Sequence, residues 1–180
     1  MIFRLDDISP NTNLAELEQQ VSLLRDYGQV ILGVNLFSKR NEEGSVYPSP
    51  PFRSRPQEYF YDVNQIMSLS SIGLLMSMEG VLVASHGMIH ARHDEMHRDA
   101  IEMSILTSCN ILRTRIFIPP FNLISPDVES VCAENAISLV RNDEKTTWRS
   151  LETENLDRSH EHWYFHPWRV SLNRLKERLS

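Results

Sequence analysis

The stretch that most restricts the fold of this chain is residues 29–36, with the sequence QVILGVNL. Its nearly continuous apolar character is typical of a strand that is buried on both faces of a parallel sheet. The residues before it are typical of a helix packed on that sheet, because apolar residues recur at helical spacing from Leu14 to Leu24, between an N-cap at Asn13 and a stop at Gly28. We therefore expect a parallel sheet whose two faces are both covered.

The rest of the chain repeats this alternation of strands and helices. Further strands are predicted at residues 1–5, 80–84, 114–118, 137–140 and 162–166. Further helices are predicted from about Ala91 to Leu112, with Met96, Ala100, Met103 and Leu106 in the core, from the Ser125 N-cap, and from near Ser171. Six or seven strands alternating with helices indicate an α/β fold with a mainly parallel sheet, and an open twisted sheet and a closed barrel both fit this pattern.

Two polar stretches, residues 38–56 and 142–160, interrupt the pattern and are predicted as long loops. The first is rich in proline, and loops of this length are usually functional or disordered. It fits a substrate-covering loop and an ordered surface loop without a ligand equally well. Its candidate sugar or phosphate contacts are Tyr47, Phe52, Arg53 and Arg55. Residues 61–70 fit a short helix, whereas residues 73–78 are a buried segment that fits either strand or helix.

The composition limits the class of protein. A chain of 180 residues, of which 41% are hydrophobic, can bury a substantial core, and its size suits a single domain over residues 1–180. The net charge of -6 argues against a nucleic-acid surface, which needs clustered Lys and Arg. The start of the chain lacks the features of a signal peptide and no apolar run approaches the roughly 18 residues of a membrane span, so we expect a cytoplasmic protein. Cys109 and Cys132 lack CxxC spacing and are expected to be buried thiols.

Side chains that can bind a metal follow two of the predicted strands. His86 and His90 come directly after the strand at residues 80–84, and their spacing allows both imidazoles to converge on one ion. Asp6 and Asp7 follow the first strand, and adjacent carboxylates repel unless they share a cation or a proton. One metal would serve both stretches. Taken separately, the aspartates also fit a solvated strand end or a helix cap, and the histidines a cap or a core position.

Four motifs together resemble the polysaccharide deacetylases, the NodB-homology or family 4 carbohydrate esterase type. Residues 5–8 (LDDI) resemble the first motif of this family, and residues 86–90 (HGMIH) resemble its histidine pair. Residues 118–122 (IPPFN) are similar to its arginine-proline-proline-tyrosine turn, and residues 164–167 (YFHP) to its late strand-end histidine. The motifs follow the family's order over nearly the whole chain. The resemblance implies an irregular, incomplete (β/α) barrel with its site at the C-terminal ends of the strands.

The resemblance implies that Asp7, His86 and His90 hold one divalent metal ion. Zinc is the default for such a ligand set, although two histidines and one carboxylate also suit iron, cobalt or nickel. His93 and His97 belong to no motif of the family. We expect them on the helix that begins near residue 91, as ordinary helix-face residues or as partners that support the ligands.

The resemblance also assigns the roles of acid, base and oxyanion contact. Asp6 would be the general base and His166 the general acid, which suits a group that titrates near neutral pH. The turn at Pro120, Phe121 and Asn122 would contact the substrate, with the Phe121 backbone N–H facing the oxyanion.

The chain departs from the family's pattern at two places. The arginine that orients the catalytic aspartate is expected just before Pro119, where this chain has Ile118. Arg141 or Arg169 would have to replace it, and Trp168 is a further candidate for a substrate contact. The family's aspartate-tryptophan motif has no clear counterpart, although Asp143 and Trp148 lie in the region where it is expected.

The resemblance implies a metal-dependent carbohydrate N-deacetylase, an amidohydrolase that acts on a C–N bond other than a peptide bond. Its substrate would be an N-acetylated sugar, a sugar nucleotide or a lipid-linked saccharide in surface-polysaccharide (O-antigen) biosynthesis. Two alternatives remain open from the sequence. One is a non-catalytic, metal-containing carbohydrate-binding protein of the same fold, and the other is a glycoside hydrolase with two catalytic carboxylates.

Overall fold

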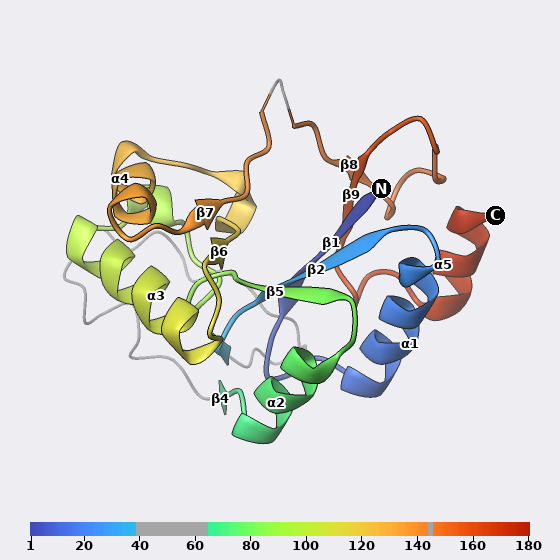
Figure 1. Cartoon of the computed structure of the whole chain (residues 1–180), viewed down its shortest axis with the longest axis horizontal. Coiled ribbons are helices and arrows are strands. Elements are labelled where there is room, and N and C mark those ends of the chain that lie inside the picture. Colours follow the sequence, from blue (N-terminus) through green and yellow to red (C-terminus); the bar gives the residue numbers. More distant parts are fainter. Residues whose placement is uncertain (39–64, 144–145) are drawn as a thin grey trace.

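A computed structural model of the chain describes residues 1–38, 65–143 and 146–180, and its centre is a seven-stranded sheet (Figure 1). The strand order is β7-β6-β5-β2-β1-β9-β8, and every pairing within this sheet is parallel. Its strands are β1 (Ile2–Ile8), β2 (Gln29–Val34), β5 (Val81–Ser85), β6 (Ile116–Phe117), β7 (Ser138–Leu139), β8 (Arg149–Ser150) and β9 (His162–Phe165). The sheet curls into a half-barrel, which confirms the predicted incomplete (β/α) barrel.

In the part of the chain that the structure describes, five helices and two 3₁₀ turns accompany the strands. The helices are α1 (Leu14–Arg25), α2 (Leu69–Ser77), α3 (Arg98–Ile111), α4 (Pro126–Glu134) and α5 (Leu172–Leu179), and the turns are η2 (His93–Glu95) and η3 (Pro120–Asn122). A short antiparallel pair, β3 (Phe37–Ser38) and β4 (Gln65–Ile66), lies outside the main sheet. Asn13, Ser125 and Ser171 accept backbone N–H bonds at the starts of α1, α4 and α5, as their sequence positions predict.

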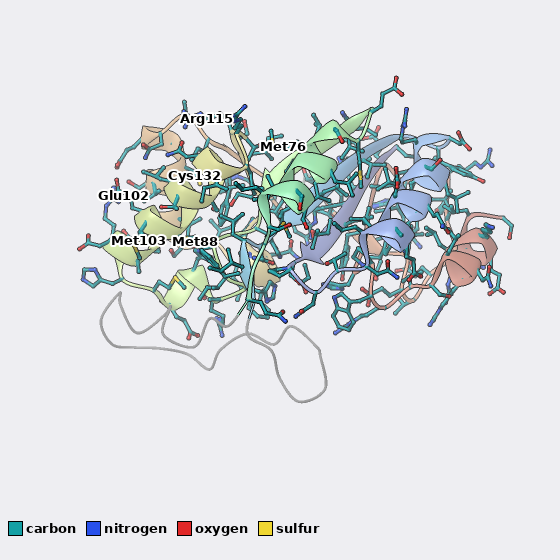
Figure 2. All side chains as sticks on the ribbon, turned by 90° about the horizontal axis from the view of Figure 1, so that it is seen from below. Met76, Met88, Glu102, Met103, Arg115 and Cys132 are labelled. Atoms are coloured by element: carbon teal, nitrogen blue, oxygen red, sulfur yellow. The ribbon has the colours of Figure 1, made fainter. Side chains whose placement is uncertain are left out.

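The helices divide the hydrophobic core into two main clusters. One cluster lies between β1, β2 and β9 and the helices α1, α2 and α5, and the other joins α3 and α4 to β6. Figure 1 shows α1 with α5 near one end of the sheet and α3 with α4 near the other, and Figure 2 shows the same separation from below. Among the described helices, none combines the length and the apolar character that a bilayer span requires. Cys109 and Cys132 are free, buried thiols, as predicted.

The alternation of side chains along β1 determines which of them face the candidate site. Phe3 and Leu5 point into the cluster beneath α1 and α5, so Arg4 and Asp6 lie on the opposite, inner face of the half-barrel. Arg4 is paired in register with Ile31 of β2 and Tyr164 of β9. The inner face therefore carries Arg4 and Asp6 beside a small apolar cluster of Ile31, Ala84 and Ile118.

Several predicted boundaries were wrong. The helix expected from residue 91 begins only at Arg98, because Met96 and His97 are extended and η2 turns the chain beforehand. Met103, labelled in Figure 2, is 39% exposed and is not a core contact. Residues 73–78 belong largely to helix α2, and the predicted loop at 142–160 contains the strand β8.

Most of the first predicted loop lies outside the described residues, as do its proposed contacts Tyr47, Phe52, Arg53 and Arg55.

Candidate metal centre and active site

A bulge near the end of β1 turns two adjacent aspartates toward one pocket. Neighbouring side chains of a regular strand point to opposite faces, so Asp6 and Asp7 could not share a site without an irregularity. The register of β1 against β2 advances from Leu5 to Ile8 while β2 advances only from Leu32 to Val34, and Asp7 has a φ of +60°. One extra residue in β1 therefore brings both carboxylates to the pocket wall.

Asp7, His86 and His90 converge on one point. The Oδ1 atom of Asp7 lies 3.2 Å from His86 Nε2 and 3.0 Å from His90 Nε2, and the three candidate ligand atoms lie within 4.8 Å of one another. This oxygen is buried, and within the described residues it takes part in no hydrogen bond. A carboxylate oxygen and two imidazole nitrogens that converge in this way fit a divalent metal ion.

The protonation of these three groups suits metal binding. His86 Nδ1 lies 2.8 Å from the Ile118 carbonyl oxygen, which can only accept, so Nδ1 carries the proton and Nε2 is left as a ligand. Burial works to raise the pKa of Asp7, but His90 and His86 outweigh it and hold that pKa well below its usual range. Burial lowers the pKa of His90 against the opposing effect of Asp7. The carboxylate is therefore ionised and His90 is neutral near pH 7, as metal ligation requires.

A chain of hydrogen bonds holds the loop that carries His86 and His90. Asn35 Nδ2 donates to the His86 carbonyl oxygen over 2.6 Å. The buried His93 donates from Nδ1 to the Ala91 carbonyl, so its Nε2 accepts from the Ser104 hydroxyl over 2.9 Å. Ser104 Oγ in turn accepts the Met88 backbone N–H over 3.1 Å. His93 therefore supports the ligand loop and does not lie on the exposed face of a helix, whereas His97 is the N-cap residue of α3.

Asp6 is held by Arg4, a residue for which the sequence analysis assigned no role. Arg4 Nε donates to Asp6 Oδ2 over 3.1 Å, and Arg4 Nη2 lies 2.9 Å from the same oxygen. Arg141, one of the two arginines expected in this role, instead pairs with Glu129, and it is not among the described residues that line the pocket. Arg169, the other one, reaches the pocket but pairs with Glu152.

The turn after β6, η3, presents Phe121 and Asn122 to the same site. Phe121 and Asn122 both have positive φ, +59° and +57°, which forms a tight and strained turn. The Phe121 ring is 42% exposed and its centroid lies 4.5 Å from that of His90. Asn122 Oδ1 accepts a hydrogen bond from Arg4 Nη2 over 2.8 Å, so the turn is joined to β1.

His166 follows β9 and faces Asp7 across the pocket. Its Nε2 lies 3.5 Å from Asp7 Oδ2, and its Nδ1 donates to the Glu152 carboxylate. Burial works to lower the pKa of His166, but the hydrogen bond to Glu152 and the charges of Asp7 and Asp6 outweigh it and raise that pKa above its ordinary value. The reciprocal contact lowers the pKa of Glu152 to about 2 despite its partial burial. His166 is therefore predisposed to carry a proton at neutral pH.

These groups surround one open pocket of about 380 Å³ at the carboxyl ends of the strands. Its described lining residues are Asp6, Asp7, His86, His90, Pro119, Phe121, Asn122, Tyr164, His166, Trp168 and Arg169. The predicted site residues therefore meet at one place, with two exceptions. Arg141 lies elsewhere, and the buried Pro120 is not among the described lining residues.

Comparison with known proteins gives matches of structure only. No family model and no curated protein sequence matches the chain. A family 4 carbohydrate esterase from Streptomyces lividans superposes with a TM-score of 0.58 and 12% identity, over 98% of this chain and 82% of the esterase. A peptidoglycan deacetylase from Bacillus subtilis gives a TM-score of 0.58 and 15% identity, over 99% of this chain and 79% of the deacetylase. A family 4 pseudoenzyme from Bacillus anthracis gives 0.58 and 10%, over 98% and 60%.

The chain has the fold of the family 4 carbohydrate esterases. The four sequence motifs predicted this resemblance, and it is confirmed for the architecture. Sequence identities this low show a shared fold and nothing further.

Within this family 4 fold, two supporting residues escaped the sequence analysis. The spacing of Arg4 and Asp6 on one strand was a usable signal, because residues two apart on a strand share a face. Glu152 gave no such signal, since it lies in a polar stretch without periodicity. Trp148, near the expected aspartate-tryptophan motif, stacks on Arg4 with the guanidinium carbon 4.7 Å from the ring centroid.

Proposed function

We propose that this protein is a metal-dependent hydrolase that removes the N-acetyl group from an amino sugar. One observation carries the proposal: a three-ligand cluster lies between a buried carboxylate and a histidine with a raised pKa, all on one pocket. Asp7, His86 and His90 are the proposed ligands, with zinc as the default ion. A divalent ion bound there would polarise the amide carbonyl and acidify water, which is the chemistry that amide hydrolysis requires.

Asp6 is the proposed general base. Its Oδ2 is held by Arg4, whereas its Oδ1 is buried and has no hydrogen-bond partner among the described residues. This free oxygen would take a proton from the water that attacks the acetyl carbon. The backbone N–H of Phe121 would face the oxygen of the acetyl group as negative charge develops on it.

His166 is the proposed general acid. Its Nδ1 is occupied by Glu152, so Nε2 is the atom that faces the pocket and would donate its proton to the departing nitrogen. The C–N bond breaks, the amine leaves with the proton of His166, and acetate carries the oxygen of the water. The two proton transfers thus use groups on different strands.

The exposed aromatic rings at the pocket support a carbohydrate substrate. Trp168 is 51% exposed beside His166, and Phe121 is exposed at the turn after β6. Exposed aromatic rings at a pocket mouth offer apolar faces on which sugar rings can pack. We further propose that residues 1–180 act as one catalytic domain in the cytoplasm, on a sugar nucleotide or lipid-linked precursor of a surface polysaccharide such as O-antigen.

The direct test is release of acetate. The zinc-loaded protein, and parallel preparations with cobalt, nickel or iron, would be incubated with N-acetylhexosamines, their nucleotide derivatives and lipid-linked forms. We expect acetate and the free amine in equal amounts from at least one of them. Metal-loaded protein that releases acetate from none of them would refute the proposal.

Two variants separate the roles within the site. Asp6→Asn should abolish turnover while metal binding is nearly retained, whereas His90→Ala should lose metal in elemental analysis and chelator titration. Equal metal content in wild type and His90→Ala would mean that the ligands are assigned wrongly.

The alternative of a non-catalytic carbohydrate-binding protein is favoured by one observation, since a family 4 pseudoenzyme shares this fold. Its other motive, the absent arginine at position 118, is weakened by the contact of Arg4 with Asp6. Sugar binding without acetate release in both wild type and Asp6→Asn would favour this alternative. The two-carboxylate glycosidase has less support, because the carboxylates among the described lining residues are the sequence neighbours Asp6 and Asp7.

A further inference from the structure

The Arg4 side chain is fully buried in the middle of β1, on the inner face of the half-barrel. A buried guanidinium is stable only where other groups compensate its charge and its hydrogen-bond donors. Here Asp6 Oδ2 and Asn122 Oδ1 accept from Nε and Nη2, whereas Nη1 has no hydrogen-bond partner among the described residues and the planar group packs against aromatic rings. The guanidinium carbon lies 4.7 Å from the Trp148 ring centroid and 5.4 Å from that of Tyr164. The orientation of the guanidinium is therefore fixed from several sides.

This arrangement joins two parts of the site that come from different strands. Two donor atoms of Arg4 approach one oxygen of Asp6, which leaves the other oxygen without a partner. Arg4 Nη2 also donates to Asn122, the residue after Phe121 in the positive-φ turn. One side chain thus sets the carboxylate and the turn relative to each other.

The arginine that the sequence pattern places at position 118 would reach the same region. An added Cβ at Gly33 would lie 3.2 Å from Asp6 Oδ1 and also 3.2 Å from Ile118 Cδ1. Asp6 Oδ1 and Ile118 Cδ1 therefore both lie next to Gly33 of β2. Ile118 is fully buried there and offers no donor to Asp6.

We propose that Arg4 is the positioning residue of this site, and that it supplies from β1 the guanidinium that position 118 lacks. It holds the Asp6 carboxylate by Oδ2, so that Oδ1 stays without a partner among the described residues, and it joins the turn that carries Phe121 to β1. The proposal rests on the proposed function, because the catalytic role of Asp6 is part of that function.

The kinetic test compares Arg4→Met and Arg4→Lys with Arg141→Met. Methionine keeps the length and apolar contacts of the stem, and lysine keeps the charge but cannot donate along both directions of the guanidinium fork. We expect kcat to fall roughly 100-fold in both Arg4 variants, as a small misplacement of a reacting group does, with little change in KM or metal content. Arg141→Met removes an arginine that pairs with Glu129 away from the pocket, and it should match wild type. Wild-type kcat in the folded Arg4→Lys protein, or a loss of kcat in step with a loss of metal, would overturn the proposal.

A transplant tests the equivalence of the two positions. Ile118→Arg combined with Arg4→Met returns one guanidinium to the neighbourhood of Asp6, so kcat should recover by about 10-fold or more over Arg4→Met alone. A double variant with the kcat of Arg4→Met would overturn the claim that position 4 stands in for position 118.

A measurement without turnover separates this proposal from the proposed function. In ¹⁵N-labelled protein the Arg4 Nε–H signal, assigned by its loss in Arg4→Lys, should exchange slowly in wild type and both shift and exchange faster in Asp6→Ala. An Arg4 signal that is indifferent to Asp6→Ala would overturn the proposed contact. Failure of the wild type to release acetate, with the signal behaving as expected, would overturn the proposed function alone.

Discussion

Glu152 accepts two hydrogen bonds from His166, one from the backbone N–H over 2.9 Å and one from Nδ1. The carboxylate also pairs with Arg169, whose Nη1 lies 3.2 Å from its other oxygen. The ring of His166 is thereby fixed, and its second nitrogen is directed toward Asp7. Glu152 approaches His166 because β8, which ends two residues earlier, pairs with β9.

The first prediction is that Glu152→Gln moves the alkaline limb of the activity profile to lower pH. Burial opposes the imidazolium form of His166, and Glu152 is the first of the groups that reverse this effect and raise its pKa. A general acid works only while protonated, so activity is lost as pH rises through that pKa. Removing the negative charge should therefore lower the pKa of His166. The pH dependence of kcat/KM measures the shift.

Glu154→Gln is the matched control for this prediction. Glu154 lies two residues away and pairs with the half-buried Arg149, so its loss should leave the limb in place. An alkaline limb that stays fixed in Glu152→Gln, or moves equally in both variants, would contradict the assignment of His166 as the acid.

The second prediction concerns the two thiols. Burial raises the pKa of Cys109 to about 11 and that of Cys132 to about 12. Because the thiolate is the reactive form, the folded protein should take up no iodoacetamide at pH 8, whereas both thiols should react in urea. Intact-protein mass spectrometry counts the adducts. Rapid alkylation of the folded protein would show that these side chains are accessible.

The fold was largely predictable because its strands are marked by local patterns. The apolar run at residues 29–36 and the Asn13 and Gly28 signals around α1 each determine structure within a few neighbouring residues. The start of α3 was not predictable in this way. The backbone of residues 91–97 is determined by the hydrogen bonds of the buried His93, which support the loop carrying His86 and His90, and not by helix propensity. The strand β8 has only two residues, so it shows no alternation that a pattern could detect.

The candidate site likewise has a part that local sequence patterns predict and a part that they do not. Asp6, Asp7, His86 and His90 could be predicted from the sequence alone, because each lies at or just after the end of an apolar strand. The bulge that lets both aspartates face the pocket depends on pairing with β2, which the sequence of β1 does not encode by itself. The supporting Glu152 likewise depends on β8 meeting β9. The features of the site that the sequence did not predict, the bulge and Glu152, therefore both depend on long-range strand pairing.

The third prediction is a loss of stability in mild acid that is due to His93. Burial lowers the pKa of His93 to about 4, so its neutral form is favoured by the folded state. The unfolded chain takes up this proton below about pH 6.5, whereas the folded protein resists it until about 4. The contribution is present above pH 6.5 and is lost as pH falls from 6.5 toward 4, at up to about 1.4 kcal/mol per pH unit.

Urea unfolding at pH 7.0, 6.0 and 5.0 would measure this slope in wild type and in His93→Asn. The variant should be less stable at pH 7, because Ser104 loses its acceptor, but its free energy of unfolding should depend less on pH. Equal slopes would mean that other groups, such as the buried His90, cause the acid sensitivity.

The last prediction compares two glycines. Gly87 lies between the proposed ligands with a φ of +90°, and an added Cβ would lie 2.7 Å from His93 Cε1 and 3.0 Å from His93 Nε2. Gly87→Ala should therefore strain the backbone and displace His93, with a loss of about 2 kcal/mol or more in the free energy of unfolding. Because the displaced loop carries His86 and His90, zinc affinity should also fall, by about 10-fold or more.

Gly73 supplies the control for this substitution. It lies on the exposed face of α2, and an added Cβ there meets no atom within 4 Å. Gly73→Ala should raise stability by about 0.5 to 1 kcal/mol, because alanine is the better helix former, and should leave zinc affinity unchanged. Chemical denaturation and a competitive zinc titration on both variants measure the two effects. If Gly87→Ala binds zinc as tightly as Gly73→Ala, the support of the ligand loop by His93 is not needed for the site.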